Sequence, residues 1–158
     1  MKNNSPHFFR KSKMKKDVQA VIFDESQKIF FFIIRREDVA VREYHWRLVK
    51  GGIEKDEKPE EALKREIFEE VGLKNIKVLN RIYGYEFTFS GIKHLVSTYL
   101  VKGDLTERPK TPSVNGNVVI SGFAWLNFNS AIRLLRWEDE RKALEKAYEY
   151  LISAKNTV

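Results

Sequence analysis

The segment Gly51–Leu73 reads GGIEKDEKPEEALKREIFEEVGL, and it carries most of what the sequence says about the fold. Its second half predicts a helix from Pro59 to Val71. Pro59 suits the first helical position, and the two glutamates that follow it suit the positive end of the helix dipole. Gly72 suits the left-handed residue that ends a helix.

Three glutamates gather on one side of this predicted helix. At 100° per residue, Glu66, Glu69 and Glu70 fall within an arc of about 100° beside the apolar stripe. Like charges so close together cost stability unless a cation compensates them. Their oxygens suit a hard divalent ion such as Mg²⁺ or Mn²⁺. The alternative reading of the spacing alone is a solvated acidic helix face, which is common.

The whole segment also fits the pattern G-x5-E-x7-R-E-U-x-E-E-x-G-U, in which U is a bulky aliphatic residue. The matched positions are Gly51, Glu57, Arg65, Glu66, Ile67, Glu69, Glu70, Gly72 and Leu73. From average residue usage, such a match arises by chance about once in a billion start points. The pattern is the Nudix box, and the chain resembles a Nudix hydrolase.

The resemblance implies a fold and an activity. The fold is an α/β (α+β) domain, a Nudix-type α/β/α sandwich with a mixed sheet, over nearly all of Asp17–Ala154. The activity is metal-dependent hydrolysis of a diphosphate linkage in a nucleoside diphosphate derivative. Arg65 and Glu57 would orient the carboxylate cluster. The ligands of the Mg²⁺ or Mn²⁺ would be three carboxylates and a backbone carbonyl: Glu66, Glu69, Glu70 and Gly51, or Lys50 in place of Gly51.

The resemblance leaves the general base open. Glu66 and Glu69 are the preferred candidates, but some family members take the base from a loop outside the box. The candidates outside the box are Glu107 and Glu86. A glutamate that many members carry shortly before a late-strand tryptophan has no counterpart, because residues 118–124 contain no acid.

Strand-like and helical segments alternate around the box. The expected strands are Val18–Phe23, Lys28–Arg35, Trp46–Val49, Lys77–Phe89, Lys93–Val101 and Val118–Phe128. Two further helices are expected, Ser130–Trp137 with Asn129 as its cap and Glu138–Ala154. Ser90-Gly91 predicts a hairpin turn, and Glu107–Gly116 predicts a long loop. Strands followed by a helix, twice over, indicate a layered α/β or α+β domain.

Cations and aromatic residues near the box are candidates for substrate contacts. The cations Arg35, Arg36, Arg47 and Lys50 either bind phosphates or pair with nearby carboxylates. The tyrosines Tyr83, Tyr85 and Tyr99 either stack on a base or pack in the sheet. We predict substrate contacts for Arg36, Arg47, Lys50, Tyr85 and Tyr99. His94 is expected to be a polar strand residue without a specific role.

The C-terminal third favours one substrate class. Phe123–Leu126, followed by the apolar residues around Leu134 and then Trp137 and Arg141, is similar to the diadenosine tetraphosphate hydrolase branch. We therefore place a dinucleoside polyphosphate first among small nucleotide substrates. The alternatives are an RNA 5′-pyrophosphohydrolase, an ADP-ribose or nucleotide-sugar pyrophosphatase, a hydrolase of oxidised dNTPs and a non-catalytic nucleotide sensor. RNA is an alternative partner that we do not favour, and the oligomeric state stays open.

The positive charge of the chain is unevenly distributed. The 158 residues carry a net charge of +7, which by itself points to nucleic acid or an anionic membrane. Residues 1–16 hold six basic residues and no acid, so +6 of the +7 belongs to a predicted flexible leader. Residues 17–158 form the predicted single domain. The leader is either a solvated tail or an arm that attracts phosphate or RNA.

Several classes of protein are excluded. The absence of cysteine excludes disulfides, thiolate metal sites and a cysteine nucleophile. No run of about 18 apolar residues predicts a membrane span. No charged start followed by an apolar run predicts secretion. We therefore predict a cytoplasmic protein that does not bind membranes.

Overall fold

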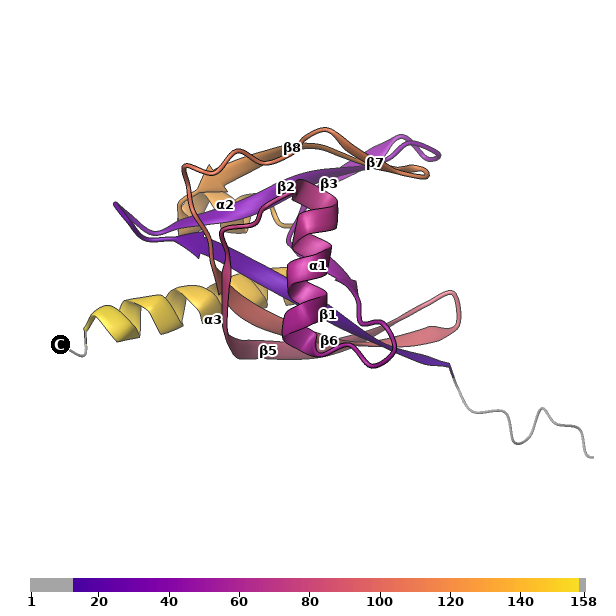
Figure 1. Ribbon diagram of the computed structural model, residues 1–158, viewed down its shortest axis with the longest axis horizontal. Helices are drawn as coiled ribbons and strands as arrows, with labels where there is room; N and C mark the ends of the chain where they lie inside the picture. The colour runs from indigo at the N-terminus through magenta and orange to yellow at the C-terminus, as the bar shows by residue number, and fades with distance from the viewer. Residues whose placement is uncertain (1–12, 157–158) are drawn as a thin grey trace, which may run out of the picture.

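The computed structural model describes residues 13–156, which form a mixed eight-stranded sheet with helices on both faces (Figure 1). The elements are β1 (Met14–Asp24), β2 (Phe30–Asp38), β3 (Glu43–Arg47), β4 (Val49–Gly52), α1 (Pro59–Val71), β5 (Lys77–Phe89), β6 (Ile92–Lys102), β7 (Ser113–Asn115), β8 (Val118–Leu126), α2 (Phe128–Leu134) and α3 (Glu138–Lys155). The strand order is β5-β6-β1-β2-β8-β7, with β3 beside β2 and β4 beside β1. β1 and β6 run parallel, whereas the other pairs are antiparallel.

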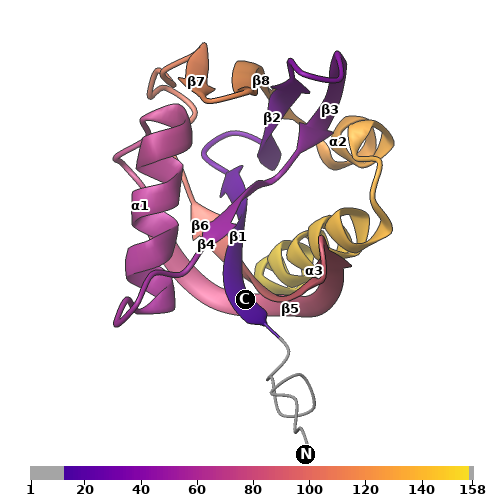
Figure 2. The same cartoon turned by 90° about the vertical axis from the view of Figure 1, so that its right-hand side faces the viewer.

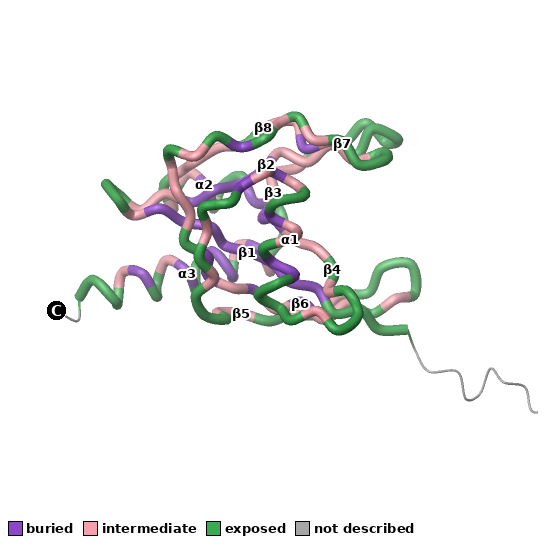
Figure 3. The backbone as a smooth tube through the Cα atoms, in the orientation of Figure 1, coloured by how far each residue is buried: buried purple, intermediate pink, exposed green. Residues whose placement is uncertain are grey.

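The two central strands bury side chains on both faces of the sheet. In β1, Val18, Ala20 and Ile22 pack in the cluster that contains α1, whereas Val21 and Phe23 pack in the cluster that contains α2 and α3. Figure 2 shows α1 on one side of β1 and the other two helices on the opposite side. Buried residues accordingly follow β1 and β2, and exposed residues follow the hairpin tips (Figure 3). Each valine, isoleucine or phenylalanine among them contributes about 1.5–3 kcal/mol by leaving water.

Helix α1 has the bounds that its sequence predicts. It begins at Pro59 and ends at Val71, and Gly72 follows with φ = 69°. The N–H of Gly72 donates to the carbonyl oxygen of Phe68 at 2.9 Å. Only glycine adopts this left-handed conformation without strain, so Gly72 fixes the end of the helix. The hairpin turn at Ser90-Gly91 also matches its prediction, since both residues have positive φ.

Three other segments differ from their predictions. Trp46–Val49 is not a single strand, because the chain leaves β2 and joins β1 at Leu48. The predicted cap Asn129 is wrong: the side chain of Asn127 accepts a hydrogen bond from the Ser130 N–H at 2.9 Å, so α2 begins two residues early. The predicted loop Glu107–Gly116 contains the short strand β7, which pairs with β8.

The N-terminal end of β1 reaches into the predicted leader. Met14 pairs with Lys93 of β6, and Lys15 pairs with His94, so the sheet extends three residues before Asp17. Residues 1–12 lie outside the described residues, and the prediction of a flexible leader stays a prediction for them. Among the helices that the structure describes, none is long and apolar enough to cross a membrane.

Candidate functional site

Arg65 joins the carboxylates of the box. Its Nε and Nη2 donate to both oxygens of Glu57, at 2.7 and 2.9 Å, in a bidentate pair. Its Nη1 donates to Glu66 at 2.9 Å and to Glu69 at 3.2 Å. Its Nη2 also donates to the carbonyl oxygen of Gly52 at 2.8 Å. One guanidinium therefore connects the loop before α1, two carboxylates of α1 and the end of β4.

Gly51 gives the Glu66 carboxylate the space that it occupies. A Cβ atom on Gly51 would lie 1.9 Å from Cδ of Glu66, far inside van der Waals contact. The backbone of β4 and the carboxylate of α1 therefore meet without a side chain between them. This contact brings two members of the predicted metal-ligand set, Gly51 and Glu66, to one place.

Glu70 is the least solvated of the three predicted metal-ligand glutamates, Glu66, Glu69 and Glu70. Burial raises its pKa to about 7, against the opposing effects of Arg36, Arg47 and Lys50. Its Oε2 atom is buried and has no hydrogen-bond partner among the described residues. Burial also raises the pKa of Glu66, although the hydrogen bond from Arg65 acts the other way. A buried carboxylate oxygen without a donor is an unfavourable arrangement that a bound cation would relieve.

The donor set fits a hard divalent cation in kind. Carboxylate oxygens with a nearby backbone carbonyl are the ligands that Mg²⁺ and Mn²⁺ prefer. As the side chains stand, no group of three Asp, Glu or His residues within residues 13–156 converges closely enough to hold a metal ion. Arg65 bonds one oxygen of Glu66 and one oxygen of Glu69, so the second oxygen of each carboxylate would have to approach the cation. The Oε2 atom of Glu70, which has no hydrogen-bond partner among the described residues, is already free to bind a cation.

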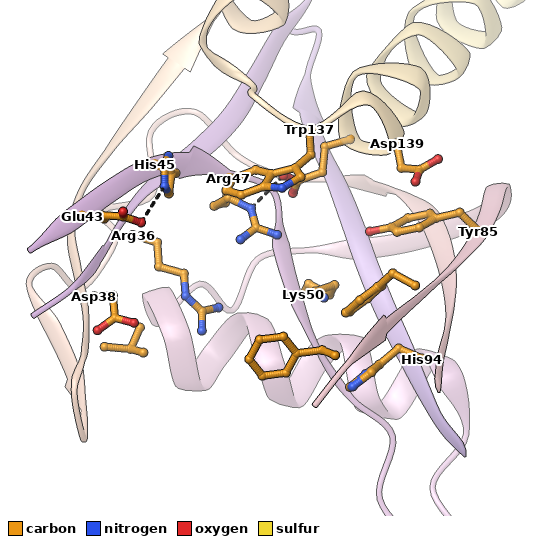
Figure 4. A pocket seen from close by; sticks show the side chains of 14 residues that line it. Arg36, Asp38, Glu43, His45, Arg47, Lys50, Tyr85, His94, Trp137 and Asp139 are labelled. Atoms are coloured by element: carbon orange, nitrogen blue, oxygen red, sulfur yellow. Dashed lines mark hydrogen bonds and ion pairs between the residues drawn. The ribbon is translucent and has the colours of Figure 1, made fainter. Parts of the chain in front are cut away.

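A pocket of about 630 Å³ opens on the face of β4 that carries Lys50, opposite the contact between Gly51 and Glu66 (Figure 4). It takes side chains from β2, β3, β4, β5, β6, β8 and α3. Three cations line it: Arg36, Arg47 and Lys50. Its aromatic residues are Tyr85, Phe87, Phe89, His45, His94 and Trp137. A pocket with cations and flat side chains suits a ligand that carries both phosphate and a planar ring.

Buried carboxylates hold two of the pocket cations. Arg47 Nε lies 2.7 Å from Oε1 of Glu140, whose side chain is 1% exposed. Lys50 Nζ lies 3.9 Å from Oδ2 of Asp17, and 4.3 Å from the centre of the Phe87 ring. Burial lowers the pKa of Lys50, although Asp17 acts the other way. Both cations are therefore held in place before any ligand arrives.

His94 belongs to the same wall of the pocket. Its Nδ1 atom lies 2.7 Å from Oδ2 of Asp17, and its ring stacks on Phe87 with centroids 4.6 Å apart. The carboxylate fixes the imidazole on one side and the aromatic ring fixes it on the other. His94 is thus a pocket residue with a fixed orientation, and not merely a polar strand residue.

The structure brings together most of the predicted site residues. Arg36, Arg47, Lys50 and Tyr85 line the pocket, while Tyr99 packs against the core cluster on the α1 face. Tyr99 lies on the wrong face of β6 because it alternates with Thr98, which bonds Gln19 on the opposite face. We therefore withdraw Tyr99 from the set of substrate contacts.

The two candidate bases outside the box have other partners. Glu107 accepts hydrogen bonds from the backbone N–H groups of Lys74 and Asn75, just after α1. Glu86 pairs with Lys93 at 3.4 Å on the surface of the β5–β6 hairpin. Arg35 pairs with Glu37 and lies 4.0 Å from the Tyr44 ring, so it takes the surface-pairing alternative. Neither Glu107 nor Glu86 lines the pocket of Figure 4.

The prediction from sequence missed many of the polar and aromatic residues that line the pocket or hold its wall, and four of them bear on the cations of the pocket. They are Asp17, His94, Trp137 and Glu140. Two of them leave a signal in the sequence. Asp17 directly precedes the apolar segment Val18–Phe23, and Glu140 stands four residues before Leu144 on the apolar stripe of the last helix. A charged residue beside or within a pattern of apolar residues that predicts burial indicates a buried, paired charge.

The domain has a mixed sheet between two helical layers, and a carboxylate-rich helix lies beside a cationic pocket. This arrangement suits a class of domain that binds phosphate-bearing ligands. The family model of the NUDIX domain matches residues 13–147. The chain therefore belongs to the Nudix family, and the predictions of the family and of the fold class are confirmed.

Sequence relatives include two RNA pyrophosphohydrolases. That of Sulfurovum sp. (strain NBC37-1) is 37% identical over 71 residues, which are 44% of this chain and 43% of the relative. That of Bartonella tribocorum (strain CIP 105476 / IBS 506) is 25% identical over 135 residues, which are 73% of this chain and 78% of the relative. The first match thus spans less than half of the relative's length.

Solved structures of Nudix proteins have the same fold. The crystal structure of a C. elegans Ap4A hydrolase binary complex has a TM-score of 0.73 at 18% identity, and the match covers 88% of this chain and 98% of that one. The MutT protein from Methanosarcina mazei Go1 has a TM-score of 0.67 at 18% identity, with 94% and 99% covered. The NUDIX domain of Shewanella oneidensis NrtR, complexed with ADP ribose, has a TM-score of 0.66 at 19% identity, with 94% of each chain covered.

Proposed function

We propose that this protein is a metal-dependent pyrophosphohydrolase that cleaves a diphosphate linkage in a nucleoside diphosphate derivative. The observation that carries the proposal is the junction of two features at β4. The Glu66 carboxylate of α1 lies against Gly51 on one face of β4, and the cations of the pocket begin with Lys50 on the other. A diphosphate at this junction would meet both.

The cations of the chain would bind and orient the phosphates. Arg36, Arg47 and Lys50 all line the pocket, and all three act on the electrostatics of Glu70. They would offset the negative charge that otherwise repels an incoming nucleophile. Positioning of this kind supplies much of the rate enhancement in phosphoryl transfer.

The carboxylates would hold the metal and accept a proton. Glu66, Glu69 and Glu70, with the Gly51 carbonyl, would bind Mg²⁺ or Mn²⁺. When bound, such an ion neutralises the phosphates, aligns them and lowers the pKa of a water molecule. Glu66 or Glu69 would accept the proton of the attacking water as general base. Arg65 would keep the unligated carboxylate oxygens in place.

The pocket favours a dinucleoside polyphosphate as substrate, as the C-terminal sequence does. Aromatic side chains stand on two sides of the cations, with Tyr85 and Phe87 on β5 and Trp137 before α3. Such an arrangement can stack a base at one or both ends of a polyphosphate. RNA 5′-pyrophosphohydrolysis is the second candidate, because the sequence relatives named above carry that name.

A substrate panel in ¹⁸O-water tests the proposal. Diadenosine tetraphosphate, 5′-triphosphorylated RNA and ADP-ribose are incubated with the protein and Mg²⁺, and the products are identified by mass. We expect the highest kcat/KM on diadenosine tetraphosphate, with one ¹⁸O in the product at the attacked phosphorus. A higher kcat/KM on the RNA would favour the second candidate.

Glu69→Gln and Glu70→Gln test the metal assignment. Changing a residue that merely supports a metal ligand lowers metal affinity or activity about 10- to 100-fold. We therefore expect the loss of a ligand to lower kcat at least about 100-fold with the fold intact. Glu60→Gln is the control, because Glu60 lies on the same helix but pairs with Lys64 on the surface. Wild-type hydrolysis by the Glu69→Gln/Glu70→Gln double variant would overturn the assignment.

A further inference from the structure

Glu140 is a buried carboxylate outside the Nudix box. It lies in the first turn of α3 and is 1% exposed. It accepts hydrogen bonds from Arg47 Nε at 2.7 Å, from the Leu48 N–H at 3.0 Å and from Gln19 Nε2 at 3.2 Å. A carboxylate is expensive to bury unless donors surround it, so these three groups account for its presence.

The arginine that Glu140 holds faces the pocket. Arg47 donates to Glu140 through Nε, so this hydrogen bond leaves its two terminal Nη groups for other partners. Its guanidinium carbon lies 4.2 Å from the centre of the Trp137 ring. Figure 4 shows the guanidinium pointing into the pocket beneath Trp137. Contacts with Glu140 and Trp137 therefore restrict Arg47 to one orientation.

The backbone contact of Glu140 lies where the chain changes neighbours. β3 pairs with β2 up to Arg47, and β4 pairs with β1 from Val49 onward. Leu48 stands between the two ladders and is 2% exposed, so its N–H needs an acceptor from elsewhere. Glu140 is that acceptor. The same carboxylate thus fixes the side chain of Arg47 and the backbone that leads to Lys50 and Gly51.

The third partner fixes the carboxylate itself. Gln19 is fully buried, and its Oε1 accepts a hydrogen bond from Thr98 Oγ1 at 2.9 Å. Because its oxygen is engaged, its amide nitrogen must face Glu140. All three groups around Glu140 are donors, so only an acceptor with two oxygens satisfies them together. A glutamine in this place would set an NH₂ group against at least one donor.

We propose that Glu140 is the positioning residue of the phosphate-binding wall, holding Arg47 so that its terminal nitrogens meet the anionic part of a nucleotide. This inference rests on the proposed function. It assigns to α3, an element outside the box, a role in substrate affinity. The competing explanation is that Glu140 only anchors α3 to the sheet.

The kinetic test is Glu140→Gln, assayed with Mg²⁺ on the best substrate of the panel. We expect KM to rise on the order of tenfold to a hundredfold, since the variant no longer aligns a charge-assisted hydrogen bond to phosphate, while kcat changes less than about threefold. Glu138→Gln is the matched control, because Glu138 lies in the same turn but pairs with Lys142 on the surface. It should keep the wild-type KM. A wild-type KM in Glu140→Gln would overturn the proposal.

A double-mutant cycle shows whether Glu140 acts through Arg47. Arg47→Met should raise KM by itself, and adding Glu140→Gln should raise it little further, because both changes remove the same interaction. Calorimetry with ADP and with adenosine needs no turnover: Glu140→Gln should weaken ADP binding and leave adenosine binding unchanged. Additive effects on KM, or equal weakening of both ligands, would contradict the proposal.

Stability measurements separate positioning from anchoring. If Glu140→Gln and Glu140→Asp both fail to fold, or if they lower Tm while KM keeps its wild-type value, the role is structural and the proposal is wrong. A wild-type chain that hydrolyses no nucleotide would instead contradict the proposed function. Activity in the wild type with an unchanged KM in the variant would contradict the positioning role alone.

Discussion

Arg65 shows at the scale of one residue how the box is organised in space. The family resemblance implies that it orients the carboxylate cluster, and it contacts both Glu57 of the loop and Glu69 of the helix. The Glu57 contact is bidentate, whereas Glu69 is reached through a single nitrogen at 3.2 Å. Glu57 is therefore the more firmly held partner, and Glu69 is the carboxylate that leaves Arg65 more easily.

The Glu57–Arg65 pair makes stability depend on acid pH. The hydrogen bond from Arg65 lowers the pKa of Glu57 from 4.5 to about 2. Because the pKa is lower in the folded state, the pair stabilises the protein fully above about pH 4.5, and this contribution is lost as the pH falls through about 2. We expect Tm in EDTA to be higher for the wild type than for Glu57→Gln at neutral pH.

The two Tm curves should converge between these pH values, as followed by circular dichroism. Glu60→Gln serves as control, since its partner Lys64 lies at 3.5 Å on the surface and the pair is exposed. The Tm of Glu60→Gln should change with pH in parallel with that of the wild type. A constant difference between the wild type and Glu57→Gln down to pH 2 would show that Arg65 does not stabilise the charged form of Glu57.

At the scale of elements, the sequence predicts what local residues decide. The bounds of α1 follow from Pro59 and Gly72, which lie within the segment itself. The break at Leu48 was not predictable in this way, because a glutamate 92 residues later accepts its N–H. The cap of α2 differs by two residues from its prediction because Asn127 and Asn129 are equally good caps by sequence, and the structure uses the first.

Gly51→Ala tests the contact between β4 and α1. The new Cβ would meet the far end of the Glu66 side chain, not backbone, so the fold can accommodate it by moving the carboxylate. We expect a nearly unchanged Tm and a loss of kcat on the order of tenfold or more, because the proposed ligand leaves its place. Both quantities come from a melting curve and an initial-rate assay on the same preparation.

Gly52→Ala is the matched control for this change. Its Cβ would meet only Oδ1 of Asp17, at an ordinary contact distance of 3.8 Å. It should therefore lose much less activity than Gly51→Ala. Equal losses in both variants would mean that the displacement of Glu66 is not the cause. A large fall in Tm for Gly51→Ala would mean that the backbone, and not the carboxylate, had moved.

At the scale of the whole molecule, the acidic cluster was predictable and the pocket was only partly so. The glutamates of α1 are neighbours in sequence, and helix periodicity brings them together. The pocket draws on seven elements, and the two residues of its Arg47–Glu140 pair are 93 residues apart. The error at Tyr99 has a related cause. A shift of one residue along a strand moves a side chain from the pocket face to the core face, and a single sequence does not fix that register.

The distribution of charge predicts how the whole chain responds to loss of its N-terminal residues. Residues 1–12 hold Lys2, Arg10 and Lys11, whereas the pocket carries its own three cations. Deleting 1–12 leaves Lys13, whose carbonyl oxygen accepts from the Lys93 N–H at 3.1 Å. We expect an unchanged Tm, and a kcat/KM on diadenosine tetraphosphate within about twofold of the wild-type value, because the phosphates meet the pocket and not the leader.

The same deletion decides whether the leader serves RNA. Each phosphate of single-stranded RNA that a basic side chain neutralises adds about 0.7 to the log–log salt slope of binding, so removing three such side chains would lower the slope by about 2. We expect no change in the slope for 5′-triphosphorylated RNA. A fall of about 2 would place the leader on the RNA and favour the second candidate, because residues 17–158 are close to neutral and hold little charge of their own for a polyanion.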